Sequence, residues 1–434
     1  MKHFVLMACA IFLSWGVFAT QGQAARITDV LDAADSNGDS FDFSFAVDFT
    51  QVLEQAKISR ERNTTSRLDK RMLMQREFEY KAVKNYLDIE LKFGLYRDLE
   101  FHINLPITIR ETNNGKQTQH YRDKYWAGDY NPATLTSGGR PSLLHDQVFG
   151  YSKWESIHKG VGDMTLGFSY SPVNQERVKE YPTWVFSIDI QVPTGPEQKP
   201  QLEKDATNQY KGKSNTTGVG KKLVGLTFST AISRRWNVVE PYFGMHYKFT
   251  FDTGKLIKNS RYEGGFVLGM EVIPYEFKAE KENEPRWKVA LDFRLQATIM
   301  GKGQDFNAIV DPLAWRKDKN GTQYWPVDTR TVPYYVYPNG QAPAYELPIE
   351  DRYTYVQGYF GIYAVLYHYL TLRTEFGFGH RTEHFLSLPN KVDASTLRPV
   401  NKNGYNTQIN EVGARVKLTN SFVFSYMFSL GINY

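Results

Sequence analysis

An alternation of large apolar with small or polar residues recurs along most of this sequence, and it constrains the fold more than any other feature. The final segment shows it most clearly, because every second residue there is apolar or aromatic: Phe422, Phe424, Tyr426, Phe428, Leu430, Ile432 and Tyr434. Four further runs, at 87–95, 99–107, 184–192 and 289–299, follow the same pattern. Successive side chains of a β-strand point to opposite faces, so each run predicts a strand with one apolar and one polar face.

Strand length separates two classes of all-β protein. Strands in soluble proteins average about five to six residues, whereas a tilted strand that crosses a bilayer needs about 9–11. The five runs fit the second class, and weaker alternation covers similar lengths at 41–50, 162–171, 221–233, 238–250, 262–275, 353–367, 369–382 and 406–418. The sequence therefore predicts an all-β, closed antiparallel transmembrane β-barrel. A soluble sandwich or solenoid is the less favoured alternative.

The number of strands follows less directly from the pattern. The five clear and eight weaker runs make thirteen candidates, whereas bacterial single-chain barrels have an even number. We expect the miscount to lie in 41–96, because 71–96 is too long for one strand. The prediction is therefore a barrel of either 12 or 14 strands.

Composition agrees with a barrel and excludes several other classes. Aromatic residues make up 15% of the chain, while the mean hydropathy of −0.48 is too polar for a bundle of membrane-spanning helices. A barrel tolerates such polarity because only alternate residues face lipid. The net charge of +5 is spread along the chain and gives no indication of nucleic-acid binding. The single Cys, Cys9, excludes disulfides in the mature protein.

The connections between the runs fall into two classes. Short links lie at 97–98, 234–237, 367–369 and 419–420, and long polar links lie at 111–160, 193–220, 300–352 and 383–405. Outer-membrane barrels have short periplasmic turns and long extracellular loops. The two classes alternate along most of the chain, which predicts this arrangement. We expect the 301–352 segment to fold inward as a constriction.

The first residues are predicted to be a signal peptide. Lys2 precedes an apolar stretch at 4–17, and Gly22 and Ala24 supply the small residues of a cleavage site. A buried core helix is the less favoured alternative. The chain is therefore expected to divide into a signal peptide (1–24), a periplasmic leader or plug (25–40) and the transmembrane barrel (41–434).

The polar faces of the predicted strands carry charges at mid-strand, and in a barrel these would line a wet lumen. The candidates for lining the lumen are Asp88, Glu90, Lys92, Glu100, His102, Asp189, Asp292, Arg294, Arg373 and Glu375. Their mixed signs argue against strong ion selectivity. Two interpretations stay open: pairing of these groups that stiffens the wall, or a polar pathway for a solute.

Two short motifs carry a family resemblance. Gly160-Val161-Gly162-Asp163-Met164-Thr165-Leu166-Gly167 would open one strand, and Val192-Pro193-Thr194-Gly195 would close the next. The pair resembles a hairpin in the outer-membrane family named for the MetA pathway of phenol degradation, whose members are taken to be transporter-like barrels. This resemblance implies uptake of small solutes, including apolar or aromatic compounds. From the residues alone, we expect Asp163 to bond to neighbouring backbone amides.

The end of the sequence resembles the sorting signal of outer-membrane barrels. Phe424, Phe428 and the terminal Tyr434 would lie on one face of the last strand. The resemblance implies two partners, the barrel assembly machinery and the outer-membrane lipid of a Gram-negative cell.

Two segments match metal-binding patterns only in part. His380 and His384 form an H-x-x-E-H pattern, which holds zinc when it lies on a helix. This segment is predicted to be a strand, on which the two imidazoles would lie roughly 13 Å apart. The segment 35–39 lacks the glycine and glutamate spacing of a calcium loop. No spacing of Ser, His and Asp identifies a catalytic site, so we expect no enzyme activity, no metal and no cofactor.

Two functions are compatible with such a barrel. The first is a channel or uptake barrel for small-molecule solutes. The second is a non-transporting structural, adhesin or assembly barrel, which a lumen occupied by residues 26–40 would favour. An open lumen with an apolar lining at mid-depth would favour transport of hydrophobic compounds. The oligomeric state stays open.

Overall fold

The structure is a computed structural model that describes most of the barrel wall and parts of its connections. The described residues are 27–31, 43–63, 72–118, 153–175, 177–198, 213–216, 218–253, 257, 259–277, 287–310, 316–317, 323–324, 347–367, 370–387 and 415–433. The predicted signal peptide (1–24) and the terminal Tyr434 lie outside these ranges.

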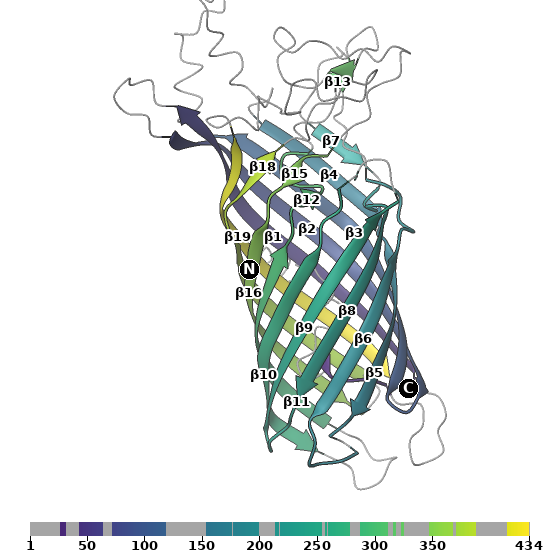
Figure 1. Cartoon of the computed structure of the whole chain (residues 1–434). Coiled ribbons are helices and arrows are strands. Elements are labelled where there is room, and N and C mark those ends of the chain that lie inside the picture. Colours follow the sequence, from purple (N-terminus) through teal and green to yellow (C-terminus); the bar gives the residue numbers. More distant parts are fainter. Residues whose placement is uncertain are drawn as a thin grey trace, which may run out of the picture.

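Twelve long strands within the described ranges form one closed antiparallel ring (Figure 1). Strands that follow one another in the ring are paired, and the last strand pairs with the first to close it. In ring order the wall consists of β1 (Phe43–Asn63), β2 (Met72–Tyr96), β3 (Leu99–Gln117), β5 (Met164–Val173), β6 (Thr183–Val192), β8 (Leu223–Ser233), β9 (Val239–Asp252), β10 (Glu263–Phe277), β11 (Trp287–Met300), β16 (Tyr353–Leu366), β17 (Leu370–Arg381) and β19 (Val416–Asn433). The predicted closed antiparallel barrel is confirmed, and twelve is its number of strands.

The miscount of strands lies at the end of the chain, so the prediction that it lies in 41–96 is wrong. β2 is a single strand of 25 residues, although the sequence favours dividing that stretch. The turn predicted at 419–420 lies inside β19, where Asn420 has a φ of 49° and the pairing with β1 shifts between Gln55 and Lys57. A bulge bends a strand without ending it, so polar residues at a bulge resemble a turn.

The alternation in the sequence sorts side chains to the two faces of the wall. Along β6 the residues are alternately buried and exposed, with Ser187 and Asp189 inside and Phe186 and Ile188 outside. The outer face is therefore apolar and the inner face polar, which is the reverse of a soluble protein. A barrel in a membrane requires this inversion, because its outer face contacts lipid and its interior is polar.

The two ends of the ring differ in their connections. One end carries short turns in which Asp98, Asn237 and Tyr367 adopt left-handed backbone angles, with φ between 51° and 58°. The other end carries the long connections, and short strands extend the wall there: β4 (Lys153–Val161), β7 (Lys213–Thr216), β12 (Gly303–Gln304), β15 (Ile349–Glu350) and β18 (His384–Ser387). The short pair β13 (Arg316–Lys317) and β14 (Gln323–Tyr324) forms a separate sheet. Short turns mark the periplasmic end and long loops the extracellular end. In the part of the chain that the structure describes, no helix has the length and apolar character needed to cross a membrane.

Candidate functional site

The structure places the ten predicted lumen residues on the polar inner face of the wall. Eight of them are buried, and Glu90 and Lys92 are partly buried. Most fall into two groups, one on β2, β3 and β6 and the other on β11 and β17. Asp88 lies on β2 but belongs to neither group.

The first group is centred on His102. Its Nε2 atom lies 2.7 Å from Oδ1 of Asp189, and its Nδ1 atom lies 3.3 Å from Oε1 of Glu100. The ammonium of Lys92 is 3.4 Å from the same Glu100 oxygen. The backbone N–H of Leu31 also donates to Glu100, over 3.1 Å. This group therefore joins three strands of the wall to a residue that precedes the barrel.

The second group is a chain of opposite charges. Arg294 donates to Glu375 over 2.7 Å, and Arg373 donates to the other oxygen of the same carboxylate. The hydroxyl of Tyr242 donates to Asp292 over 2.7 Å. These contacts tie β9, β11 and β17 together across the inner face. Such pairing of buried charges supports the interpretation of lumen charges as groups that stiffen the wall.

Residues 27–31 of the predicted leader lie inside the barrel, near its periplasmic end. Ile27 is buried against Ala231, Tyr242 and Val267, in a small apolar cluster on the inner wall. The hydroxyl of Thr28 is within hydrogen-bonding distance of Ser233. Within the predicted leader or plug (25–40), the residues that the structure describes therefore occupy the lumen.

The 301–352 connection folds inward, as far as it is described. After β11 the chain first extends the wall as β12, where Gln304 N donates to Asn259 O over 2.8 Å. It turns inward after β12. Ile309 and Val310 at the end of this stretch are almost completely buried. We call Asp305–Val310 the inward segment. It lies inside the extracellular end of the barrel.

An ionic cluster above the membrane-spanning strands holds the inward segment. Asp305 pairs with Arg261 and lies 2.8 Å from the ammonium of Lys221. Arg261 also lies 2.8 Å from Glu350. The His384 ring lies 2.8 Å from the Thr382 carbonyl oxygen and 2.8 Å from the Glu350 carboxylate. Lys221, Arg261 and the His384 ring thus surround the two carboxylates.

These neighbours shift the acidity of the two carboxyl groups. Burial by itself raises the pKa of Glu350, but Arg261 and His384 outweigh it and hold that pKa at about 2. Burial opposes ionisation of Asp305 in the same way, yet Arg261 and Lys221 keep its pKa below the usual range. Both groups are therefore ionised under ordinary conditions, and the cluster is intact.

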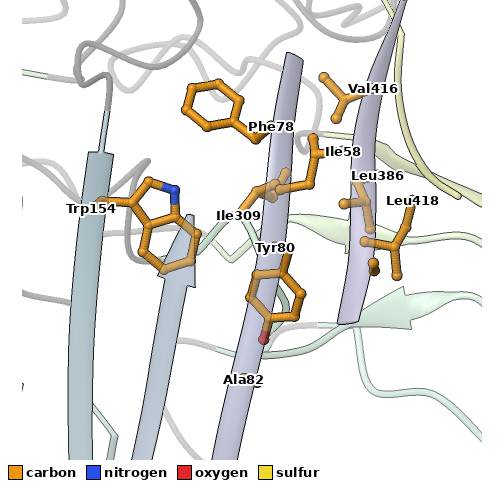
Figure 2. Close-up of a cluster of buried hydrophobic side chains, with 10 residues drawn as sticks. Ile58, Phe78, Tyr80, Ala82, Trp154, Ile309, Leu386, Val416 and Leu418 are labelled. Atoms are coloured by element: carbon orange, nitrogen blue, oxygen red, sulfur yellow. The ribbon is translucent and has the colours of Figure 1, made fainter. Parts of the chain in front are cut away.

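The extracellular mouth contains an apolar core inside the barrel (Figure 2). Trp154 from β4 is 2% exposed, and its ring stacks on Tyr80 of β2 at 6.1 Å. Ile309 of the inward segment packs into the same cluster, which also contains Ala56, Ile58, Phe78, Ala82, Leu386, Val416 and Leu418. Apolar packing as well as ion pairs therefore holds the inward segment in place. Trp154 thus lies inside the mouth and not on the outer face of the wall.

A cavity of about 280 Å³ lies inside the barrel beside the inward segment. Its wall combines aromatic side chains such as Tyr80, Tyr86 and Tyr353 with charged ones such as Lys84 and Asp88. It is also lined by Gln304 and by five residues of the inward segment: Asp305, Phe306, Asn307, Ala308 and Val310. The lining is therefore mixed, and it differs from the apolar lining expected for a channel of purely hydrophobic compounds.

Asp163 closes a break in the wall. β4 and β5 together oppose β3, and they are interrupted at Gly162 and Asp163. The Asp163 carboxylate accepts hydrogen bonds from the backbone N–H of Gly195 at 3.0 Å and of Lys221 at 2.9 Å. The expectation that Asp163 bonds to backbone amides is confirmed. These bonds hold the connection between β6 and β8 against the interruption.

Sequence reasoning missed the ionic cluster. Arg261 and Asp305 lie in connections without alternation, so no pattern indicates that they face each other. His380 and His384 do not share a site, because His380 contacts the Ser421 carbonyl whereas His384 contacts Glu350. Among the described residues, no group of His, Cys, Asp and Glu is arranged to hold a metal.

The outer face forms an apolar belt around the ring. Exposed side chains on it include Phe168, Ile188, Phe228, Phe243, Leu268, Phe293, Phe360, Phe378, Phe422 and Phe428. Trp184, Trp236, Tyr247 and Tyr262 are also exposed, as expected for aromatic residues at a membrane interface. A closed barrel with a polar interior and an apolar exterior is a transmembrane β-barrel of the bacterial outer-membrane class.

Comparisons with known proteins add resemblances in architecture. No family model matches the sequence, and no curated protein matches it. Among solved structures, the COG4313 outer membrane channel from Pseudomonas putida F1 is 10% identical with a TM-score of 0.39, covering 90% of this chain and 94% of that one. A Pseudomonas aeruginosa FadL homologue is 8% identical with a TM-score of 0.32, covering 98% and 99%. The deltaS2 mutant of the TodX monoaromatic hydrocarbon channel is 11% identical with a TM-score of 0.34, covering 96% and 94%. At these identities and TM-scores the resemblances carry no inference about transport.

Proposed function

We propose that this protein is an outer-membrane uptake barrel for small molecules that combine an apolar or aromatic body with polar groups, and that the described conformation is its closed state. The observation that carries the proposal is the cavity of about 280 Å³ inside the lumen. A cavity of this size is near the lower end for a small-molecule site. Its mixed aromatic and charged lining suits an amphipathic solute.

Two segments inside the barrel support a gated rather than a permanently sealed barrel. The inward segment packs inside the extracellular end of the barrel, and Ile27–Leu31 contacts the inner wall near the periplasmic end. Neither segment belongs to the twelve-stranded wall, so either can move without breaking the ladder of backbone hydrogen bonds. Loops and termini move far more readily than a closed sheet.

A second candidate function is a non-transporting structural barrel. The leader in the lumen favours it, and so do the buried charge pairs, since both fill space through which a solute would pass. A catalytic role at the rim is not part of the proposal, because His380 and His384 contact different partners.

Conductance in a planar bilayer distinguishes the two candidates. The refolded protein is compared with a variant that lacks residues 26–40, and a heat-shifted gel band verifies folding of both. We expect the intact protein to be nearly silent and the shortened variant to show discrete steps that scale with salt concentration. Addition of an aromatic alcohol should then block the steps. Silence of both folded proteins would contradict uptake and support the structural role.

A further inference from the structure

The cavity wall carries one buried carboxylate without a partner. Asp88 on β2 is 6% exposed and lines the cavity, yet it makes no hydrogen bond or ion pair in the structure described. Other carboxylates of the lining are paired: Glu111 lies 3.2 Å from Lys84, and Glu54 lies 2.9 Å from Arg381. A buried carboxylate without a positive partner is costly, and a cation bound in the cavity would offset that cost.

The position of Asp88 increases this cost. The pairing of β1 with β2 places Asp48 directly opposite Asp88, and both side chains are buried on the inner face. Like charges at directly opposite positions of neighbouring strands destabilise a sheet. A positive group that enters the cavity beside Asp88 would reduce this repulsion.

The charges of the lining as a whole favour a cation. The cavity is lined by seven carboxylates and five cationic side chains, so its formal charge is two negative: Glu54, Asp88, Glu111, Asp163, Glu263, Asp305 and Glu350 against Lys84, Lys221, Lys248, Arg261 and Arg381. The Lys248 ammonium donates to the neutral amide of Gln191 over 2.7 Å. An anionic ligand could therefore pair with the Lys248 ammonium. The net negative charge of the lining would nevertheless oppose its binding.

An aromatic ring stands next to the unpaired carboxylate. Tyr86 is two residues before Asp88 on the same strand, so both side chains lie on the inner face, and both line the cavity. A carboxylate beside an aromatic ring is a favourable environment for an ammonium group, which the ring attracts through its π face.

We propose that the cavity binds small organic cations, in which an ammonium group is attached to an apolar or aromatic body, and that Asp88 is the counter-charge of the ammonium. This inference rests on the proposed function, because it names the class of solute that the barrel would take up. Binding of the cation can nevertheless be measured without measuring transport. The cavity volume of about 280 Å³ limits the ligand to roughly one aromatic ring with a short substituent.

The test is calorimetric titration of the folded barrel in detergent with three probes of similar shape. Benzyltrimethylammonium is the cation, benzyl alcohol the neutral probe and benzoate the anion. The variant Ile27→Asp, which is designed to displace the leader, is titrated beside the wild type so that a closed lumen does not hide the site. We expect the cation to bind at least roughly tenfold more tightly than the other two probes, the scale of one charge-assisted contact.

Two Asp→Asn variants assign the effect to a residue. Asp88→Asn should weaken binding of the cation roughly tenfold or more. Asp252→Asn makes the same change of charge at an exposed residue at the end of β9 and should leave binding unchanged. Asp88→Ser is a second variant in case Asp88→Asn does not fold. Equal or tighter binding of benzoate, absence of cation binding in both backgrounds, or full cation binding by the Asp88 variants would each overturn the inference.

The outcome is separable from that of the proposed function. If the barrel binds cations through Asp88 but never conducts, the proposed cation site is supported and the proposed uptake function is contradicted. If the barrel conducts but binds no cation, the uptake function is supported and the cation site is contradicted.

Discussion

The side-chain hydroxyls of Thr28 and Ser233 lie 2.7 Å apart, although 205 positions separate the two residues in the sequence. Ser233 ends β8 on the inner wall, so this contact places the leader inside the ring. Together with the packing of Ile27 and the bond from Leu31 to Glu100, it makes the leader part of the lumen. The leader is attached by few contacts, and single substitutions should release it.

The substitution Ile27→Asp should open the periplasmic end. It would put a carboxylate among Ala231, Tyr242 and Val267, where the free-energy cost of burying a charge favours the leader leaving the lumen. We expect a higher conductance and faster proteolysis of the leader. The control is Asp29→Asn, since Asp29 is exposed between buried neighbours. Equal protease resistance of wild type and Ile27→Asp would show that the leader does not depend on this packing.

Acid should loosen the extracellular closure within a defined pH range. The pKa of Glu350 is about 2 in the folded protein, against about 4.3 for an ordinary glutamate. A carboxyl whose pKa is lowered on folding stabilises the fold above its unfolded value and ceases to do so as the pH falls through the folded one. We therefore expect the hydrogen-exchange protection factors of the inward segment, which relate measured to intrinsic rates, to fall between about pH 4 and pH 2.

The variant Glu350→Gln tests the origin of this acid effect. It removes the titrating group and should give fast exchange of the inward segment already at neutral pH, with less change on acidification. Lys302→Gln is the matched control, because Lys302 is an exposed neighbour whose partner, Asp351, lies outside the cluster. An unchanged pH profile in Glu350→Gln would assign the acid response to other groups.

The substitution Asp163→Asn should loosen the connection between β6 and β8. An asparagine oxygen can still accept from Gly195, but its amide would face the N–H of Lys221, which then lacks an acceptor. Leaving one such donor unsatisfied costs about 1–3 kcal/mol. Faster hydrogen exchange in 193–198 and 218–222 is the expected result. Exchange in the β8–β9 turn should not change, and an increase there would indicate general destabilisation instead.

Two glycine substitutions should differ in their effect on the mouth. A Cβ at Gly115 would lie within 2 Å of the Trp154 indole, whereas a Cβ at Gly358 would meet no atom within 4 Å. Gly115→Ala should therefore displace Trp154 from the apolar core and lower the thermal midpoint by several degrees, while Gly358→Ala should not lower it. Equal midpoints for the two variants would show that Trp154 adds little to the closure.

Much of the wall could be predicted because lipid imposes a simple rule. The alternation at Trp184–Val192 identifies both the strand and its inner face, since a residue on the wrong side would meet lipid. Two of the described residues depart from this rule. Asn420 bends β19 without ending it, and Trp154 lies on a strand that extends beyond the bilayer, where apolar groups turn inward.

The site was less predictable than the wall. The alternation indicates that Asp88 faces the lumen, but it cannot show that Asp88 lacks a partner, because partners come from strands far apart in the sequence. Arg261, Asp305 and Glu350 meet only because three connections converge at one end of the ring. Such contacts depend on loop conformation, for which a single sequence contains no periodic signal.

The pairing of β1 with β19 has a consequence for biogenesis. Ser44 donates a hydrogen bond to Asn433, 389 positions further along the chain, whereas the other neighbouring strands of the ring follow one another in the sequence. Hairpins can form as the polypeptide emerges, but this seam requires the last strand. Until β1 and β19 pair, the sheet has two open edges that can pair with other chains. Synthesis must therefore finish before closure, and the nascent polypeptide needs chaperone protection on its way to the membrane.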